Sequence, residues 1–410
     1  MLVPKIGVVC THARLGIRCG DRRFSSALQQ LMPRIRSFIT IRQSATTVIG
    51  SAEAVQRISR ADKLVGSWLL TCSGMALGAV FLGGLTRLTK SGLSMVDWHP
   101  LNEGRPRTQA EWEAEFAKYQ QFPEYKVRNK DMTLEQFKSI YWMEYIHRMW
   151  GRTVGAAFYI PAAAFWARGY FNRGMKKQII YLGTLLAAQG LMGWYMVRSG
   201  LEEKHPSSHD TTPRVSNLRL AVHLGAAFFF YGLLFRAALH RLIPAQRLAY
   251  SKPLVRFSWY GRLATGLVFT TALSGALVAG IEAGLVYNSF PKMADSWIPS
   301  DILAFEPKWK NFVENPTTVQ FDHRLLGETV FCLLTALYIY SRKVPLPPRA
   351  RLATHAMLAA AWLQVGLGIT TLLTYVPTPV AVSHQVGALT LLTTLLWLTH
   401  ELKLIRRLPK

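Results

Sequence analysis

The sequence has 410 residues, of which 50% are hydrophobic and only 17% are charged. About a quarter of the residues of a soluble protein are normally charged, so this composition argues against a soluble globular domain. The formal net charge of +25 would be typical of a nucleic-acid-binding protein. The basic residues, however, gather in the N-terminal segment and in particular loops, which indicates membrane topology and no nucleic-acid partner.

The N-terminal segment, residues 1–60, is rich in arginine and serine, and its only acidic residues are Asp21 and Glu53. An arginine-rich, acid-poor start of this kind is typical of a mitochondrial transit peptide. A disordered basic tail is the alternative. We therefore predict a transit peptide or disordered segment over residues 1–60, followed by a protein of the mitochondrial inner membrane.

Eight apolar stretches follow in the sequence. Each is close to the roughly 20 residues that a helix needs to cross a bilayer. They are residues 64–86, 141–167, 178–197, 220–235, 263–281, 319–340, 352–374 and 380–398. The sequence therefore predicts an all-α, multi-pass membrane protein with eight transmembrane helices.

Basic residues are distributed unevenly over the connections between these helices. The connections after the second, fourth and sixth helices, and the C-terminus, carry many Lys and Arg residues, and Glu401 is their only acid. The positive-inside rule therefore predicts that both termini face the matrix. The long connection over residues 87–139 then faces the intermembrane space. There Trp112, Phe116 and Tyr119 recur at helical spacing, which predicts a short amphipathic helix, either on the membrane surface or packed within the loop.

The two halves of the sequence repeat the same motifs in the same order. The second and sixth predicted helices contain H-R-x-x-G, beginning at His147 and His323, and the third and seventh contain Q-x-x-x-G. The fourth and eighth carry His223 and His384 near their starts. Because each repeat has an even number of helices, the two repeats are parallel. The repeat predicts two tandem, pseudo-symmetric four-helix bundles.

We assign residues 61–242 to the N-terminal bundle, 243–258 to a linker in the matrix, and 259–410 to the C-terminal bundle. All even-numbered helices start on the same side of the membrane. The four histidines are therefore expected near the intermembrane-space face, within about two turns of their helix starts. Each bundle then offers one pair of histidines, on its second and fourth helices.

Such histidine pairs favour a haem-binding function. Ionisable residues inside a membrane span are unfavourable and tend to be functional, and two facing imidazoles suit the axial positions of haem iron. The glycine four residues after His147 and His323 lies on the same helical face, where it lets a flat macrocycle or another helix approach closely. Arg87, Arg148 and Arg324 are candidate contacts for haem propionates, with lipid headgroups as the alternative.

One difference breaks the repeat. Glu144 stands three residues before His147, where the second half has Gln320 before His323. A carboxylate at this spacing shares a helical face with the histidine, and it can move protons or stabilise positive charge beside a cofactor. The structural alternative is a salt bridge from Glu144 to Arg148, four residues later.

Four stretches of the sequence resemble the haem A synthase family. They are GGLTRLT at residues 83–89, SGLSM at 91–95, EYIHRMWG at 144–151 and YNSFPKM at 287–293. The resemblance extends over residues 63–405. It implies oxidation of the C8 methyl group of haem O to a formyl group, by two successive hydroxylations and a dehydration, which gives haem A for cytochrome c oxidase. It also implies that the N-terminal half binds the substrate haem and the C-terminal half a resident haem b.

When the family's ligand residues are matched to this sequence by motif, the resemblance implies that His147 and His223 bind the iron of the substrate haem. It implies likewise that His323 and His384 bind the iron of the cofactor haem. Glu144 becomes the catalytic acid. The resemblance further implies O2 as a substrate, a ferredoxin as electron donor, association with haem O synthase, and contact with inner-membrane lipid. The residues alone leave two other functions open: a bis-histidine electron-transfer protein with two b-type haems, and a transporter with parallel repeats.

Overall fold

The computed structural model describes residues 58–99, 104–202, 214–244 and 246–406. The predicted transit peptide, residues 1–60, lies outside the described residues except for its last three. The structure described from Ile58 onward belongs to one compact unit.

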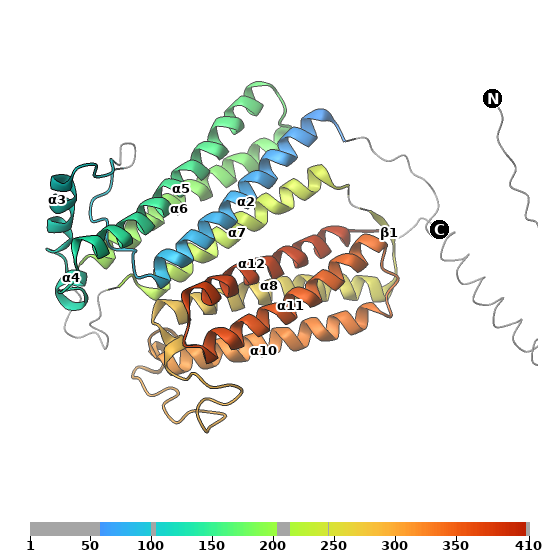
Figure 1. Cartoon of the computed structure of the whole chain (residues 1–410). Coiled ribbons are helices and arrows are strands. Elements are labelled where there is room, and N and C mark those ends of the chain that lie inside the picture. Colours follow the sequence, from blue (N-terminus) through green and yellow to red (C-terminus); the bar gives the residue numbers. More distant parts are fainter. Residues whose placement is uncertain (1–57, 100–103, 203–213, 245, 407–410) are drawn as a thin grey trace, which may run out of the picture. The chain divides into compact units, whose positions relative to one another are not determined.

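The described part of the chain is almost entirely helical (Figure 1). Its long helices are α2 (Arg60–Leu88), α5 (Leu134–Ala167), α6 (Arg173–Gly200), α7 (Asn217–Leu242), α8 (Lys252–Gly280), α10 (Pro316–Ser341), α11 (Pro348–Leu373) and α12 (Thr378–Glu401). The short elements are α3 (Gln109–Tyr119), α4 (Pro123–Arg128), α9 (Asn311–Glu314), the 3-10 helices η1 (Ala283–Leu285) and η2 (Lys308–Lys310), and the strands β1 (Arg247–Ala249) and β2 (Leu404–Arg406).

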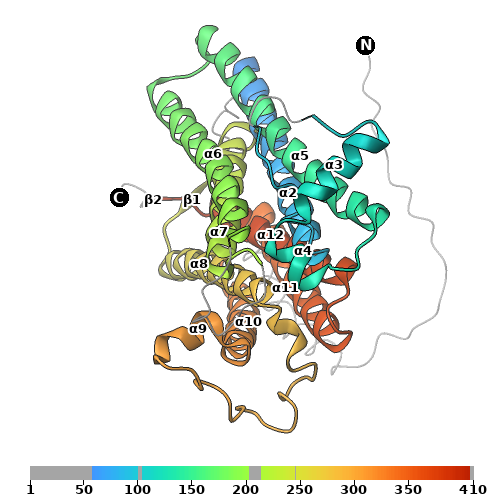
Figure 2. The same ribbon diagram turned by 90° about the vertical axis from the view of Figure 1, so that its left-hand side faces the viewer.

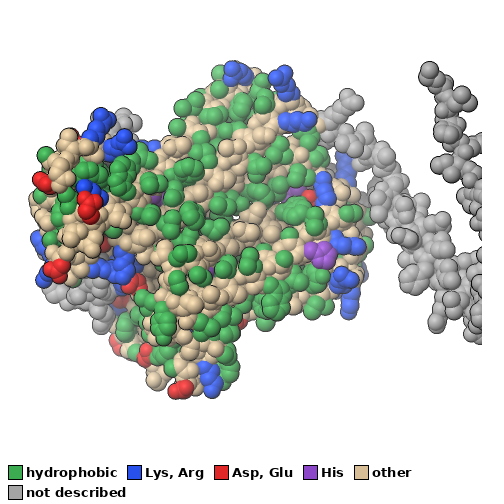
Figure 3. All heavy atoms as spheres, viewed as in Figure 1, with side chains coloured by type: hydrophobic (Ala, Val, Ile, Leu, Met, Phe, Trp, Pro, Cys, Tyr) green, Lys and Arg blue, Asp and Glu red, His purple; other side chains and the backbone are tan. Residues whose placement is uncertain are grey.

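Seven helices of the described residues are long and apolar enough to cross a membrane. The predicted span over residues 141–167 lies in α5, which is outside this set because charged, aromatic and glycine residues lower its mean hydropathy. Figure 3 shows hydrophobic side chains over the middle of the helices, with Lys and Arg mostly toward their ends. The prediction of an all-helical, multi-pass membrane protein is confirmed at this level.

Local sequence signals set where several long helices begin. The side chains of Ser59, Thr133, Asn172 and Ser251 each accept a hydrogen bond from a backbone N–H in the first turn of α2, α5, α6 and α8, respectively. These caps satisfy donors that have no partner within the helix. A proline stands in the first turn of α8, α10, α11 and α12. Proline lacks a backbone N–H, but the N–H groups of the first turn have no acceptor within the helix, so no hydrogen bond is lost there.

Two helix starts differ from the sequence prediction. α8 begins at Lys252, so the connection between the halves is residues 243–251, and the rest of the predicted linker 243–258 is helical. The Ser251 cap and the proline of the first turn start this helix upstream of its apolar stretch. α5 begins at Leu134, so His147 lies about three and a half turns inside its helix instead of two.

The early start of α5 follows from an aromatic cluster at that end of the bundle. Trp112 and Tyr119 of α3 are buried against Phe137 and Tyr141 of α5, and the Trp112 and Tyr141 ring centroids are 5.1 Å apart. The helix predicted from Trp112, Phe116 and Tyr119 is therefore present as α3. It packs against the start of α5, as a helix packed within the loop would.

The two sets of long helices have matching contacts. In the first set α2 packs against α5 and α7, and α6 contacts α5 and α7; in the second α8 packs against α10 and α12, and α11 contacts α10 and α12. The sets meet where α7 packs on α8, α12 on α2, and α7 on α12 (Figures 1 and 2). β1 follows α7 and β2 follows α12, and the two strands pair in parallel.

Candidate functional site

A large cavity lies among the long helices. Its volume is about 1800 Å³, whereas most small-molecule sites occupy roughly 300–1,000 Å³. The four histidines predicted as iron ligands all line it: His147, His223, His323 and His384. The structure thus brings both histidine pairs to the wall of a single cavity, as two matched sites would require.

His323 of α10 and His384 of α12 face each other in the second set of helices. Their ring centroids are 6.3 Å apart, and the ring planes are nearly perpendicular, at 88°. Nδ1 of His323 lies 2.7 Å from the hydroxyl oxygen of Ser274, and Nδ1 of His384 lies 3.2 Å from the carbonyl oxygen of Gln364. These hydrogen bonds orient both rings and leave Nε2 as the nitrogen that can bind a metal ion.

His147 of α5 and His223 of α7 hold the matching places in the first set. Nδ1 of His147 is buried and has no hydrogen-bond partner among the described residues. Gln189 of α6 lies beside His223, and with its amide nitrogen turned toward the ring it donates to Nδ1 of His223 at 2.8 Å. Among the described residues, His147 therefore lacks the Nδ1 partner that orients each of the other three rings.

Each of the four rings faces a glycine on a neighbouring helix. A Cβ atom at Gly83, Gly193, Gly275 or Gly368 would lie 3.2, 3.6, 3.1 or 2.9 Å from Cε1 of His147, His223, His323 or His384, respectively. At Gly83, Gly275 and Gly368 these distances leave little room for a side chain between helix and ring, whereas the distance at Gly193 is an ordinary van der Waals contact. The Q-x-x-x-G motif of the second half is thereby explained, because Gly368 admits the ring and the glutamine bonds the histidine's helix. Gln364 does so through Nε2, which donates to the carbonyl oxygen of His384 at 3.0 Å.

The site offers pairs of imidazoles and not a complete metal cage. Across the described ranges, no three His, Cys, Asp or Glu side chains are placed to hold a metal ion. A single His pair therefore suits a metal whose remaining ligands come from elsewhere. Haem iron meets this condition, because its macrocycle supplies four nitrogens and the protein only the axial ligands.

Glu144 lines the same cavity and is only 2% exposed. Its Oε2 accepts hydrogen bonds from the Ser94 hydroxyl at 2.7 Å and from the Met95 N–H at 2.9 Å. Its Oε1 accepts two bonds from Arg148, at 2.8 and 3.1 Å. The salt bridge to Arg148 that the sequence offered as an alternative is thus present within α5. The bonds from Ser94 and Met95 to Glu144 tie the loop after α2 to α5.

Gln320 occupies the corresponding place beside His323. Its Nε2 donates to the carbonyl oxygen of Ala283 at 2.7 Å, and its Oε1 accepts from Arg324 at 2.9 Å. The amide thus makes the same two kinds of link, to a loop and to an arginine. Tying the loop down therefore needs no carboxylate at this position.

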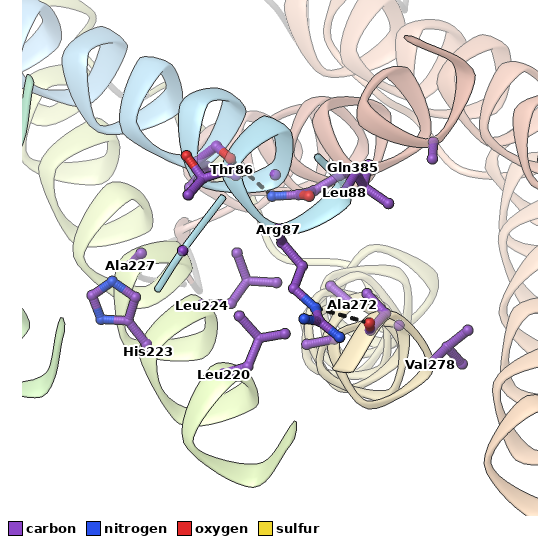
Figure 4. A pocket seen from close by; sticks show the side chains of 18 of the residues that line it. Thr86, Arg87, Leu88, Leu220, His223, Leu224, Ala227, Ala272, Val278 and Gln385 are labelled. Carbon is purple, nitrogen blue, oxygen red and sulfur yellow. Dashed lines mark hydrogen bonds between the residues drawn. The ribbon is translucent and has the colours of Figure 1, made fainter. Parts of the chain in front are cut away.

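The three candidate propionate contacts, Arg87, Arg148 and Arg324, line the cavity but also bond to backbone carbonyl oxygens. Arg148 donates to those of Met95 and Asp97 at 2.6 and 2.8 Å, and Arg324 to that of Tyr287 at 2.7 Å. Figure 4 shows Arg87 pointing from α2 to the end of α8, where it donates to the carbonyl oxygens of residues 279 and 280 at 3.1 and 2.8 Å. Two of the motifs, at 91–95 and 287–293, are thus loops that these arginines hold.

A second buried carboxyl group lines the cavity, that of Glu124 in α4, which no sequence motif marks. This side chain is 5% exposed and accepts a hydrogen bond from the Tyr119 hydroxyl at 3.1 Å. Burial raises the pKa of Glu124 to about 7. Glu124 lies in a loop region with many other acids, and only tertiary packing distinguishes it from them.

Comparison with known proteins identifies the family. Residues 66–396 match the COX15-CtaA family model, described as cytochrome oxidase assembly protein. The chain is 53% identical to heme A synthase COX15 of Mus musculus, covering 100% of this chain and 95% of that protein. It is 57% identical to heme A synthase COX15 of Homo sapiens over 85% of this chain and 84% of that protein, and 38% identical to the Saccharomyces cerevisiae protein of the same name over 87% and 79%. The chain therefore belongs to the cytochrome oxidase assembly protein family that includes the heme A synthases COX15.

Proposed function

We propose that this protein is a haem A synthase, which oxidises the C8 methyl group of haem O to a formyl group. The observation that carries the proposal is the single cavity lined by four histidines of matched helices. Membership of the family and the names of the relatives support it. A cavity larger than an ordinary ligand site is what two macrocycles would require.

The reaction consumes O2, electrons and protons. Each hydroxylation uses one O2, two electrons and two protons, places one oxygen atom in a C–H bond and releases one water. The second hydroxylation gives a gem-diol, which loses water to leave the formyl group. We infer that a ferredoxin supplies the electrons from the membrane surface.

In this account the first set of helices binds the substrate. His147 and His223 hold the iron of haem O, and the glycines that face them, Gly83 and Gly193, give the rings and macrocycle room. Glu144 moves protons near His147: an oxygen of its carboxylate accepts a proton from one gem-diol hydroxyl and returns it to the hydroxyl that leaves as water. Arg148 holds this carboxylate in place through an ion pair at 2.8 Å.

The second set of helices would hold a resident haem b through Nε2 of His323 and His384. Bound there, haem b supplies one-electron transfer to the substrate site. Ser274 and Gln364 orient the two ligands from their Nδ1 side. The neutral Gln320 suits this role, because a site that only passes electrons needs no proton-transferring group.

We propose an architecture of eight transmembrane helices, with α5 as the eighth, in two pseudo-symmetric bundles over residues 61–242 and 252–406. The matching contacts within each set of helices support it, as does the reciprocal pair of contacts between sets, α7 with α8 and α12 with α2. The lengths and the loop charges support placement in the mitochondrial inner membrane, with the histidines toward the intermembrane space. Association with haem O synthase would deliver the substrate within the membrane.

The test is conversion of haem O by the purified protein in lipid nanodiscs, with O2, a ferredoxin and its reductase. We expect haem A among the extracted pigments of the wild type, and haem O without haem A, beside the resident haem b, when the His147→Ala variant is used. A wild-type protein that carries haem and is reduced by the donor, but leaves haem O unchanged, would instead be a bis-histidine electron-transfer protein.

A further inference from the structure

The two sets of helices differ at one point on the cavity wall, between the second and third helix of each set. When α5 and α10 are aligned on His147 and His323, Gly155 corresponds to Phe331. When α6 and α11 are aligned on the glutamines of their Q-x-x-x-G motifs, Ala187 corresponds to Trp362. The first set therefore has two small residues where the second has two aromatic rings.

In the second set, these rings join the two helices. The Phe331 and Trp362 centroids are 4.8 Å apart, and the rings meet edge to face at 87°. Phe331 lines the cavity, while Trp362 does not line it and is 61% exposed. The aromatic pair thus closes the cavity wall between α10 and α11.

In the first set, no side chain of comparable size stands at this place. Gly155 and Ala187 both line the cavity, and so does Gly190, one turn further along α6. A Cβ atom added to Gly155 or Gly190 would meet nothing within 4 Å. The space that Phe331 and Trp362 fill in the second set is therefore open between α5 and α6.

A hydrogen bond frames one end of this opening. Tyr159, one turn after Gly155, donates its hydroxyl proton to the carbonyl oxygen of Gly183, one turn before Ala187, at 2.6 Å. This bond ties α5 to α6 just beyond the opening. At the other end of the opening lie Gly151 and Gly193, which both line the cavity. A Cβ atom at Gly193 would lie 3.6 Å from Cε1 of His223, and one at Gly151 would meet nothing within 4 Å.

We propose that the opening between α5 and α6, framed by Gly155, Ala187 and Tyr159, is the binding site for the isoprenoid chain of haem O. This inference rests on the proposed function. Haem O differs from haem b by a long, apolar hydroxyethylfarnesyl chain, so only the substrate site has to accommodate it. The chain leaves the cavity through this opening and ends in the hydrocarbon of the bilayer, where an apolar chain is well solvated.

The double variant Gly155→Phe/Ala187→Trp tests the proposal. It introduces the aromatic residues that the second set has at the corresponding positions, Phe331 and Trp362, and should close the opening. Titrations with haem O and with iron protoporphyrin IX, which lacks the isoprenoid chain, measure binding at the first site of protein that already carries its resident haem. We expect haem O affinity to fall by about tenfold or more, the loss expected when roughly two methylene groups lose their burial. Affinity for iron protoporphyrin IX should stay within about twofold, since its macrocycle does not pass the opening.

The matched control is Ile160→Phe/Leu191→Trp, which adds the same rings to α5 and α6 at positions that are 69% and 60% exposed and do not line the cavity. It should leave both affinities unchanged. The single variant Ala187→Leu fills less space and serves if the double variant does not fold. Equal losses for both haems, or an unchanged haem O affinity in a folded closed variant, would overturn the proposal. Failure of the wild-type protein to convert haem O would contradict the proposed function, whatever the affinities.

Discussion

Glu144 is held on both oxygens, by Arg148 on one side and by the loop after α2 on the other. At the residue scale this arrangement allows two roles, as a loop anchor and as a proton-transferring group. Gln320 separates them, because it anchors the corresponding loop without a carboxylate. A glutamine at position 144 keeps one acceptor oxygen for the Met95 N–H, so it should keep the loop anchor. Its amide nitrogen cannot accept from Arg148, so the variant should lose the ion pair together with the proton transfer.

We accordingly expect Glu144→Gln to retain folding and resident haem while haem A formation falls by about a hundredfold, the lower range for the loss of an acid–base group. Haem O or a hydroxylated intermediate should accumulate. Chromatography of the extracted pigments measures this distribution, with the thermal midpoint as the control for folding. Near-normal conversion by a well-folded variant would leave Glu144 with the anchoring role alone.

Glu124 gives a pH-dependent prediction. Burial raises its pKa to about 7, while the hydrogen bond from Tyr119 acts in the opposite direction. In the unfolded chain its pKa is about 4.3, so the folded protein binds the proton more tightly between these values. The contribution of Glu124 to stability is therefore fully present below about pH 4.3 and is lost as the pH rises through about 7.

Glu124→Gln removes this titration but leaves an oxygen that can accept the Tyr119 bond. We expect the variant and the wild type to have similar thermal midpoints at pH 5. At pH 8 the variant should be the more stable, by at most about 3 kcal/mol, at about 1.4 kcal/mol per pKa unit. A difference that is the same at both pH values would show that Glu124 does not titrate in this range.

At the element scale, the approach of α11 to the His384 ring depends on one glycine. A Cβ atom at Gly368 would lie 2.9 Å from Cε1 of His384, closer than real Cβ contacts, so helix or ring must shift. Gly366, on the same helix, provides the control, because a Cβ atom there meets nothing within 4 Å. We expect Gly368→Ala to lower the haem content and to shift the absorption spectrum of the purified protein, and Gly366→Ala to change neither. Equal spectra and haem contents for the two variants would contradict the assigned packing.

Much of the element scale was predictable from the sequence. The apolar stretches located the long helices, because a membrane span must carry its own backbone hydrogen bonds and a continuous apolar surface. The start of α5 at Leu134 was not predicted, because hydropathy identifies only the apolar part of a helix. The first turns of α5 extend beyond that part and pack against α3. The helical start of α8 within the expected linker was marked by Ser251, a local cap signal that hydropathy also ignores.

The candidate site was predictable where the repeat marked it. Internal repetition singled out His147, His223, His323 and His384, and all four line the cavity. The glycines facing these rings, and the burial of Glu124, depend on contacts between helices that are distant in sequence. No local pattern reports such contacts, so only the three-dimensional arrangement identified them.

At the scale of the whole molecule, the charge of the connections predicts the orientation in the membrane. The ends of α5, α7, α10 and α12 lead into connections rich in Lys and Arg, which would face the matrix. We expect a tag at the C-terminus to resist protease in mitoplasts, and a tag inserted after Gly104 to be digested. Digestion of the C-terminal tag in intact mitoplasts would reverse the orientation and place the histidines near the matrix.

We propose a division of labour between two matched sets of helices. Both have a histidine pair and facing glycines, but only the first has a carboxylate three residues before the histidine of its second helix, where the second set has Gln320, and only the first has an opening in its wall between its second and third helices. The second set would then be the permanent haem site and the first the site of turnover.

The most direct measurement is the haem content and type of the purified single variants His147→Ala, His323→Ala and His384→Ala, compared with the wild type. We expect His323→Ala and His384→Ala to lose or alter the resident haem b, whereas His147→Ala should keep most of it and fail to make haem A. Equal loss of resident haem from all three variants would contradict the division of labour.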